Sequence, residues 1–404
     1  MRLAVALIFT LVSGCASSRL PVLPTTYYVA TTGSDSNAGT EAAPFRTIAQ
    51  GSRALAPGDT LFIRQGTYAE AMIHRSGGFT FQRGTSMNAM TRYAAYPGEE
   101  GKVVIQPPSG NFVMLFGGTA YVEVSGLVLD GANTSGGAVV ILRAHDHHNR
   151  FLRNEIRNGR QGISGGGEHE IIGNEIHHMT GYGIYTDGDN GLVEGNIFHD
   201  LGGYAIHLFQ QNHTVNNWVI RNNTFFGNGK GFLWSKTGEM RKTSAVLISR
   251  GRNNQFYNNL IYNNHAGIFV GYGASDTLVA NNTIYGSDDY GILVSSEHSG
   301  SLNARIINNI VWGNRGEQIL NTGTNTTLQA NFTSDPWVVN AEGGDFHLRA
   351  GSPAIEAGVA LREVPVDMVG GARPSGSACD AGAFQFNAPP AGSQTYTAPV
   401  VPVH

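Results

Sequence analysis

The stretch IIGNEIHHMTGYGIYTDGDNGLVEGNIFH, residues 171–199, decides the fold because it contains one pattern twice. Each copy has an apolar residue three positions before an asparagine and another two positions after it, as in Ile171, Asn174 and Ile176. Side chains five positions apart point to opposite faces of a straight strand, so both can be buried only if the chain bends between them. We expect the asparagine at this bend, where it tolerates left-handed backbone and forms side-chain hydrogen bonds.

The same asparagine recurs through most of the chain, with gaps of 20, 22, 27, 36, 23, 27 and 22 residues. Its positions are Asn154, Asn174, Asn196, Asn223, Asn259, Asn282, Asn309 and Asn331. A period near 22 with insertions is typical of stacked supersecondary units and is too short for helix pairs. A third apolar segment, usually Gly-Ile as in Gly183-Ile184, follows each asparagine. Three strands and three turns per repeat predict an all-β, single-domain parallel β-helix of about ten coils.

Both ends of this region carry further motifs. Residues 27–70, YYVATTGSDSNAGTEAAPFRTIAQGSRALAPGDTLFIRQGTYAE, resemble the start of secreted right-handed parallel β-helix proteins of the pectate-lyase-like superfamily. DFHLRAGSPAIEAG (345–358) and DAGAFQF (380–386) resemble the closing motif of the same proteins. The resemblance covers about residues 27–386 and implies a right-handed helix, and residues 44–55 are expected to form an N-terminal capping helix. The scaffold carries lyases, hydrolases and epimerases, so it does not specify an activity.

The chain ends predict export. Arg2, the apolar run 3–12 and Ser13-Gly14 have the pattern of a signal peptide, and Val-Ser-Gly-Cys resembles a bacterial lipoprotein signal in which Cys15 is lipidated. We expect a signal peptide at 1–14, a spacer at 15–26, the β-helix domain at 27–386 and a disordered Pro-rich tail at 387–404. The expected location is the cell envelope, as an outer-membrane lipoprotein. Lipidation would leave Cys379 without a disulfide partner, so we expect it to be a buried small residue.

Composition and charge narrow the class of partner. Charged residues make up only 14% of the chain, glycine occurs 54 times and the formal net charge is −4. This composition excludes a disordered or coiled-coil chain, and the small charge does not favour a nucleic-acid partner. We expect a monomer whose partner is an extracellular polysaccharide.

In the enzymes of this resemblance the substrate groove follows the first strand of each coil, which we assign to the Gly-Ile segments. Outward positions then include Tyr185, Asp187, His207 and Phe209. One period stretches to 36 residues and contains the basic segment 231–252, in which either GFLW or AVLI could be the strand. Long insertions in repeat proteins usually lie on the binding face.

These residues suit an acidic polysaccharide. Removing the proton next to a uronate carboxyl needs a cation and a base with a pKa near ambient pH. Asp187 and Asp189 are candidate Ca²⁺ ligands. Lys236 or His207 is the candidate base, and Arg241 or Arg250 would hold a uronate. Tyr185, Phe209, Arg250 and Trp234 are the expected substrate-binding residues.

An alternative remains for each of these assignments. TDGDN can be a polar turn, and the lysines can belong to a solvated loop. The calcium-dependent lyases of the resemblance have three or four clustered aspartates, and this chain shows no such cluster, which weakens the transfer of their metal site.

The histidines favour structural roles. His177 belongs to a column three positions after the asparagine, which we interpret as rings stacked between coils rather than a sugar platform. The members of the column are Arg157, His177, His199, Phe226, Tyr262, Tyr285 and Trp312. His178 shares a turn position with Asn158 and Asp200. The AHDHHN run at 144–149 is expected at the turn before a strand, where other coils place Asn or Asp. Its spacing matches no zinc pattern.

We therefore predict a polysaccharide-active protein whose reaction is β-elimination of a uronate-containing glycan. Two alternatives are a non-catalytic glycan-binding or surface-structural protein and an inverting glycoside hydrolase. The hydrolase needs two carboxylates roughly 6.5–9.5 Å apart. The candidate pairs are Asp187 with Asp189 and Asp187 with Glu239.

Overall fold

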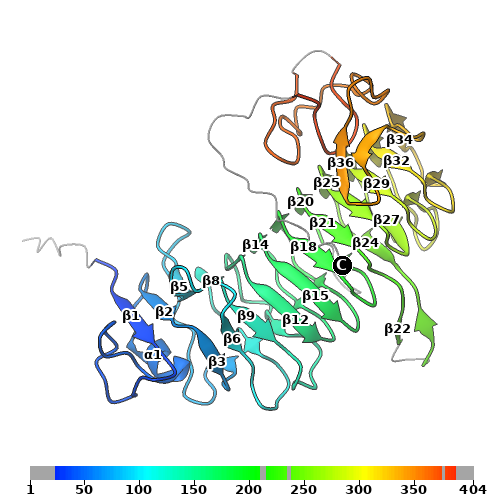
Figure 1. Cartoon of the computed structure of the whole chain (residues 1–404). Helices are drawn as coiled ribbons and strands as arrows, with labels where there is room; N and C mark the ends of the chain where they lie inside the picture. Colours follow the sequence, from blue (N-terminus) through cyan, green and yellow to red (C-terminus); the bar gives the residue numbers. More distant parts are fainter. Residues whose placement is uncertain (1–22, 210–214, 234–237, 375–377, 388–404) are drawn as a thin grey trace, which may run out of the picture.

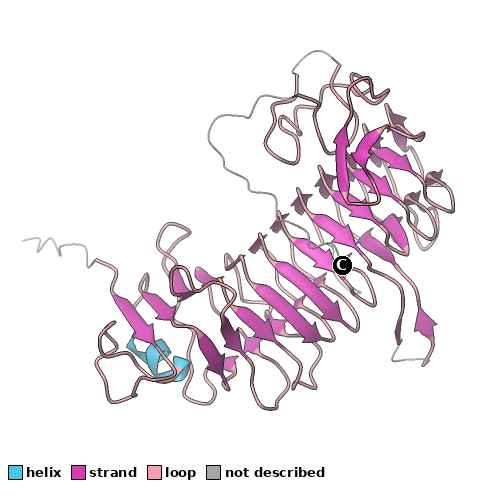
Figure 2. Ribbon diagram, viewed as in Figure 1, coloured by secondary structure: helices cyan, strands magenta, loops and turns pink. Residues whose placement is uncertain are grey.

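The computed structural model describes residues 23–209, 215–233, 238–374 and 378–387. Within these residues the chain winds into a rod of stacked coils whose strands form three parallel sheets (Figures 1 and 2). This confirms the predicted single parallel β-helix of about ten coils.

Each sheet collects one strand from successive coils of the described chain. Sheet A has twelve strands in the order β1 (Thr26–Val29), β2 (Thr60–Ile63), β5 (Thr91–Ala95), β8 (Val122–Ser125), β11 (Arg150–Leu152), β14 (Glu170–Ile172), β17 (Leu192–Glu194), β20 (Val219–Arg221), β25 (Gln255–Tyr257), β28 (Leu278–Ala280), β31 (Arg305–Ile307) and β34 (Thr327–Gln329). Sheet B has ten, in the order β3 (Gly66–Tyr68), β6 (Val103–Ile105), β9 (Val128–Asp130), β12 (Glu155–Gly159), β15 (Glu175–Met179), β18 (Ile197–His199), β21 (Thr224–Phe226), β26 (Leu260–Tyr262), β29 (Thr283–Tyr285) and β32 (Ile310–Trp312). Sheet C also has ten, in the order β4 (Met72–Ile73), β7 (Met114–Leu115), β10 (Val140–Ile141), β13 (Ile163–Ser164), β16 (Ile184–Thr186), β19 (Ile206–Leu208), β24 (Ser244–Ser249), β27 (Ala266–Gly271), β30 (Ile292–Val294) and β33 (Ile319–Asn321).

The asparagines form one file between sheets A and B, as predicted. The backbone N–H of each ladder asparagine donates to the side-chain oxygen of the next, over 2.8–3.0 Å from Asn154 to Asn331. The prediction is wrong in one detail, because the left-handed residue at the bend is the one before the asparagine. Arg153 has φ 52°, Asn222 58° and Asn308 58°. The ladder asparagine therefore contributes hydrogen bonds, and its predecessor makes the turn.

The interior of the rod is apolar. In the coil that contains the opening stretch, Ile171, Ile176 and Ile184 come from the three sheets, and each is at most 1% exposed in the same buried cluster. The apolar residues three before and two after the asparagine thus face one core, as the bend requires. The coils are spaced like neighbouring strands, by roughly 4.8 Å.

The helix at the first coil is shorter than expected. α1 spans Ile48–Ala54, not 44–55, and Thr47 is its N-cap, accepting from the backbone N–H of Gln50 at 3.1 Å. The preceding residues are held otherwise, because Phe45 donates its backbone N–H to Tyr28 and Asp35 accepts from Arg46. Ile48 is fully buried in the rod core, so α1 covers the first coil as a cap (Figure 2). Among the described residues no helix is long and apolar enough to span a bilayer.

The C-terminal part leaves the rod and returns along its side. After β34, the strands β35 (Val338–Asn340) and β36 (Asp345–Leu348) pair as an antiparallel hairpin. Phe346, Leu348 and Ala354 form a second apolar cluster with Tyr262 and Trp312 on the outer face of sheet B. The motif expected to close the fold therefore covers a flank of the last coils (Figure 1). Cys379 is a free thiol that is 1% exposed, which confirms its assignment as a buried small residue.

Candidate functional site

The outer face of sheet C carries the side chains predicted to line a groove. The register aligns Ser164, Tyr185, His207, Leu247, Phe269 and Leu293 in one row. The inward neighbours Ile184 and Ile206 are buried in the core. The assignment of the Gly-Ile segments to one continuous sheet is confirmed.

The expanded coil uses AVLI as its strand. β24 contains these residues and lies between β19 and β27 in sheet C. Phe232–Leu233 of the GFLW segment form β22, which pairs with β23 (Met240–Arg241) in a separate hairpin. This hairpin projects from the rod beside sheet C (Figure 1). Lys236 and Trp234 lie outside the described residues, so their predicted roles stay predictions.

Aromatic side chains gather around His207. Its ring centroid is 4.9 Å from Tyr182, 4.9 Å from Tyr185, 4.7 Å from Tyr204 and 5.3 Å from Phe209. We call these residues, with Phe232 at 5.3 Å from Tyr182, the ring cluster. Tyr185, Tyr204 and Phe209 are half-buried, whereas His207 is only 9% exposed. The cluster is therefore an aromatic surface with an imidazole in its floor.

Burial changes the chemistry of this imidazole. Desolvation lowers the pKa of His207 to about 3, so the ring is neutral at ordinary pH. Its Nδ1 atom is buried without a hydrogen-bond partner within the described structure. A base with this pKa removes protons poorly near neutrality. The imidazole is therefore a neutral ring among the aromatic side chains of this face.

The tyrosine hydroxyls of the ring cluster stay protonated. Burial raises the pKa of Tyr182 to about 12 and also raises the pKa of Tyr204. Each hydroxyl can therefore donate a hydrogen bond to a ligand oxygen. The sequence interpretation missed both residues. A signal for them exists, because Tyr182, Tyr204 and Tyr290 each stand two positions before an inward Ile.

Arginines flank the ring cluster. The Arg250 guanidinium lies 5.4 Å from the centroid of Phe209. The positive charges of Arg160 and Arg241 act on the Tyr182 hydroxyl, and Arg241 also acts on Tyr204. The structure thus brings five predicted residues together on one face: Tyr185, His207, Phe209, Arg241 and Arg250.

Asp187 and Asp189 stabilise a turn at the edge of this face. Asp187 accepts from the backbone N–H of Gly166 at 2.9 Å. Asp189 accepts from the backbone and side chain of Asn216 at 2.7 and 3.1 Å. Within the described residues, neither belongs to a group of three acidic, histidine or cysteine side chains whose ligand atoms converge. Calcium prefers six to eight oxygen ligands, so this geometry supports the polar-turn alternative more than a calcium site.

The turn is also tightly stacked on the preceding coil. A Cβ atom on Gly188 would lie 2.3 Å from the backbone nitrogen of Gly167, and one on Gly167 would lie 2.5 Å from the nitrogen of Asp189. Glycine is the residue that permits this approach. The glycines of GGG and TDGDN therefore serve close packing between coils.

The predicted structural roles of several histidines are confirmed on other faces. His177 and His199 stack at 4.8 Å with an interplanar angle of 4°, and His199 stacks on Phe226 at 4.9 Å. His178 has the left-handed backbone typical of turn positions, with φ 53° near the end of β15, and Asn158 has the same conformation near the end of β12. The AHDHHN run is also a turn, in which Asp146 accepts from the backbone N–H of Thr119 at 2.6 Å. The histidines and aspartates of the opening stretch are thus not one site.

Comparison with known proteins agrees with this architecture. The model described as "Right handed beta helix region" matches residues 105–243 and 239–353, and a protein family of unknown function, DUF1565, matches residues 31–75. The uncharacterized protein YwoF of Bacillus subtilis (strain 168) is 24% identical over 347 residues, which are 76% of this chain and 74% of that protein.

Solved structures are similar in fold. Pectate lyase Pel9A superposes with a TM-score of 0.58 at 18% identity, covering 91% of this chain and 97% of that chain. XylC in complex with xylose gives 0.51 at 14% identity over 77% of this chain and 76% of that chain. The GH136 lacto-N-biosidase of Eubacterium ramulus gives 0.51 at 13% identity over 76% of this chain and 68% of that chain. At these identities the likeness shows the fold. Because the family match extends over residues 105–353 of 404, more than half of the sequence, this chain belongs to the right-handed β-helix family.

Proposed function

We propose that the outer face of sheet C binds an acidic polysaccharide and that the protein acts on it. The observation that carries this proposal is the ring cluster around His207 with arginines beside it. Sugar rings present apolar faces that stack on aromatic side chains, and their hydroxyls pair with tyrosine and imidazole groups. Guanidinium groups bind carboxylates through paired hydrogen bonds, which would select uronates over neutral sugars.

The proposed reaction is β-elimination. A base removes the proton next to the uronate carboxyl, the electron pair forms a carbon–carbon double bond, and the glycosidic oxygen leaves with a proton. We propose Lys236 as the base, because the low pKa of His207 makes it a weak base at neutral pH. Arg241 and Arg250 would hold the carboxylate. The pectate lyase name of one structural relative is consistent with this reaction.

Incubation with a panel of pectate, alginate and glycosaminoglycans, each with and without Ca²⁺, tests the reaction. We expect unsaturated-uronate absorbance to rise on at least one of them and to be lost in Lys236→Ala, while a Lys102→Ala control far along the chain keeps it. No absorbance on any substrate would remove β-elimination. Release of reducing ends without unsaturated product would favour the hydrolase instead. A calcium requirement would support the predicted roles of Asp187 and Asp189.

Non-catalytic binding is the second candidate, and the pKa of His207 favours it. In that case glycan retention occurs without turnover, and Lys236→Ala does not change it. Tyr185→Ala and Phe209→Ala test whether the glycan binds to this face, because both residues are half-buried members of the ring cluster. Each should weaken retention, whereas Trp337→Ala, an exposed ring on the C-terminal segment, should not.

We further propose that the protein works in the cell envelope, anchored through Cys15. The lipoprotein-like segment before this cysteine supports the proposal. Metabolic labelling with a fatty acid should mark the wild type and fail to mark Cys15→Ser. Equal labelling of both proteins would reject the anchor.

A further inference from the structure

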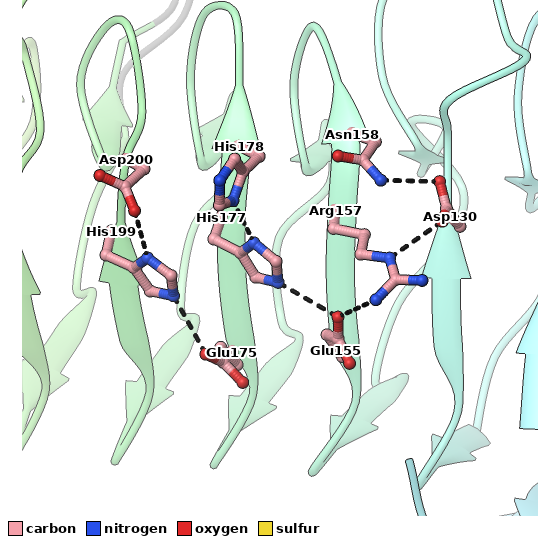
Figure 3. A network of polar contacts seen from close by, with 9 residues as sticks. All are labelled: Asp130, Glu155, Arg157, Asn158, Glu175, His177, His178, His199 and Asp200. Carbon is pink, nitrogen blue, oxygen red and sulfur yellow. Dashed lines mark hydrogen bonds and ion pairs between the residues drawn. The ribbon is translucent and has the colours of Figure 1, made fainter. Parts of the chain in front are cut away.

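The outer face of sheet B carries a histidine and carboxylate network (Figure 3). The network borders a hollow whose lining shares no residue with the ring cluster. Strands β12, β15 and β18 contribute the network in register. Glu155 pairs with Glu175, and Arg157 is followed by His177 and His199 in the next coils. The hollow has a volume of about 710 Å³, and the tip of the β35–β36 hairpin at 342–344 forms part of its wall.

Both ring histidines are oriented by a carboxylate from the preceding coil. His177 Nε2 lies 3.2 Å from Glu155, and His199 Nε2 lies 3.0 Å from Glu175. A carboxylate only accepts, so each Nε2 carries a proton. The Nδ1 of His199 faces the Asp200 carboxylate and carries a proton as well, which a metal ion bound at that nitrogen would displace. This is the arrangement in which proteins usually hold a metal-ligating histidine, with its second nitrogen bonded to a carboxylate.

Further ligand groups stand where the Nδ1 atoms point. His199 Nδ1 lies 2.8 Å from Asp200 Oδ2, and His177 Nδ1 lies 2.5 Å from His178 Nδ1 (Figure 3). His178 lies near the end of β15 and Asp200 directly follows β18, both with left-handed backbone at φ 53°. Ligand atoms of His178, His199 and Asp200 all lie within 4.8 Å of one another.

We propose that His178, His199 and Asp200 bind one divalent transition-metal ion, such as Zn²⁺, with Glu175 as the outer partner of His199. Imidazole nitrogens with one carboxylate are the donor set that zinc, nickel and copper prefer. Two ligand atoms of a tetrahedral zinc ion are roughly 3.3 Å apart, from bonds of about 2.0–2.1 Å. Rotation of the exposed His178 side chain closes the remaining distance.

The charge around the hollow also favours a cation. The network contains four carboxylates, those of Asp130, Glu155, Glu175 and Asp200. Among the described residues it contains one arginine, Arg157. Arg157 is already bonded to Asp130 and Glu155. The negative charge left over is concentrated beside His199, where the proposed ion binds.

Three protein ligands leave a fourth position open. His178 and Asp200 are exposed, so an ion can enter from solvent. Next to Asp200, Gly227 of the following coil leaves room, because a Cβ there would come within 3.1 Å of Asp200 Oδ1. The open position faces the hollow, where water or a ligand oxygen would complete the coordination.

Dialysis against ZnCl₂ followed by metal analysis tests the proposal. Asparagine occupies the His178 position in two other coils, at Asn158 and Asn263, with φ of 58° and 53°. His178→Asn and Asp200→Asn should therefore keep the fold and lose the zinc. The matched control is His298→Asn, which changes another exposed histidine in the same backbone conformation, with φ 49°, outside any converging group of described ligands.

We expect one tightly bound zinc per wild-type chain and per His298→Asn chain. Titration should show that Glu175→Gln weakens binding by roughly 10–100-fold, the usual cost of losing an outer partner. Failure of the wild type to retain zinc would overturn the proposal. Retention by His178→Asn and Asp200→Asn, with loss in His148→Asn, would overturn it by moving the ion to His147, His148 and Glu168, one of the two other converging histidine groups described. None of these results depends on glycan binding at sheet C.

Discussion

At the scale of the residue, the asparagine ladder holds the coils in register. Asn223 is fully buried, and its side-chain oxygen accepts from the backbone and side chain of Asn196 at 2.9 Å each. Its side-chain nitrogen donates to Val193 and Arg221. Each buried coil bend thus has its polar groups satisfied by one amide.

Removal of one amide should be costly. Asn223→Ala leaves the Asn196 N–H and the Val193 carbonyl buried without partners, so we expect a loss of about 3 kcal/mol in the free energy of unfolding. The denaturant midpoint checks this. Asn133→Ala, at an exposed position, should change stability by less than about 0.5 kcal/mol. Equal midpoints for the two variants would show that the ladder does not stabilise the rod.

His169 makes stability depend on pH. Burial lowers its pKa to about 3, with smaller contributions from the charges of His147 and His148. The unfolded chain takes up a proton below about pH 6.5 and the folded chain does not, so stability is full above that pH and falls toward pH 3. At pH 5 the loss from this residue is about 2 kcal/mol.

The variant to compare is His169→Asn, which removes the titrating ring. Its free energy of unfolding should fall less steeply between pH 6.5 and about pH 4 than that of the wild type. Asn133→Ala, which changes an exposed residue without a titratable side chain, should keep the wild-type slope. Parallel curves for His169→Asn and the wild type would contradict a buried neutral ring.

At the scale of the element, the C-terminal hairpin completes a core that the coils leave open. Phe346 is 1% exposed, and its ring lies 5.3 Å from Tyr262, 5.8 Å from Tyr285 and 5.9 Å from Trp312. The hairpin thus covers the part of the aromatic column formed by Tyr262, Tyr285 and Trp312. The part with His177 and His199 faces the hollow. The position of the hairpin therefore defines the hollow.

Truncation of the anchoring ring should release the hairpin. We expect Phe346→Ala to cost about 3–5 kcal/mol and to make the C-terminal segment sensitive to protease. Trp312 fluorescence should shift to the red as water reaches it. Val339→Ala, in the same hairpin but 42% exposed, serves as control and should resist the protease. If both variants resist the protease, contacts other than those of Phe346 hold the C-terminal segment in place.

Elements differ in how far the sequence could predict them. The strands around each asparagine were predictable because their apolar positions repeat at fixed distances. The choice between GFLW and AVLI was not, because both are short apolar runs and only pairing with β19 and β27 decides it. The capping helix is shorter than predicted because Asp35, eleven residues away, holds the backbone of Arg46.

At the scale of the whole molecule, the local charge beside the proposed binding face is opposite in sign to the net charge of the chain. The chain carries a formal charge of −4, yet Arg160, Arg241 and Arg250 lie by the ring cluster. Binding of an acidic glycan should therefore weaken as NaCl is raised, because salt screens the local attraction. A neutral glycan should bind weakly at all salt concentrations. Salt-independent binding of the acidic glycan, measured by calorimetry, would contradict the role of the arginines.

Only part of the site was predictable from the sequence, because strand alternation gives the face of a side chain whereas packing between coils decides its burial. Tyr185, His207 and Phe209 follow from strand alternation, so their shared face was foreseen. The burial of His207 under Tyr182 and Tyr204 depends on packing between coils, which spacing alone does not show. The hollow on sheet B depends on a hairpin more than 140 residues beyond His199 in the chain.

Oxidative footprinting of the protein with an acidic oligosaccharide bound tests the central claim most directly, because it identifies the face that the glycan covers. We predict that Tyr185, Tyr204 and Phe209 become protected, while Tyr28 on sheet A and Trp337 on the C-terminal segment stay as reactive as in the free protein. Protection confined to sheet A, or to the hollow beside His178, with sheet C unchanged, would contradict the account.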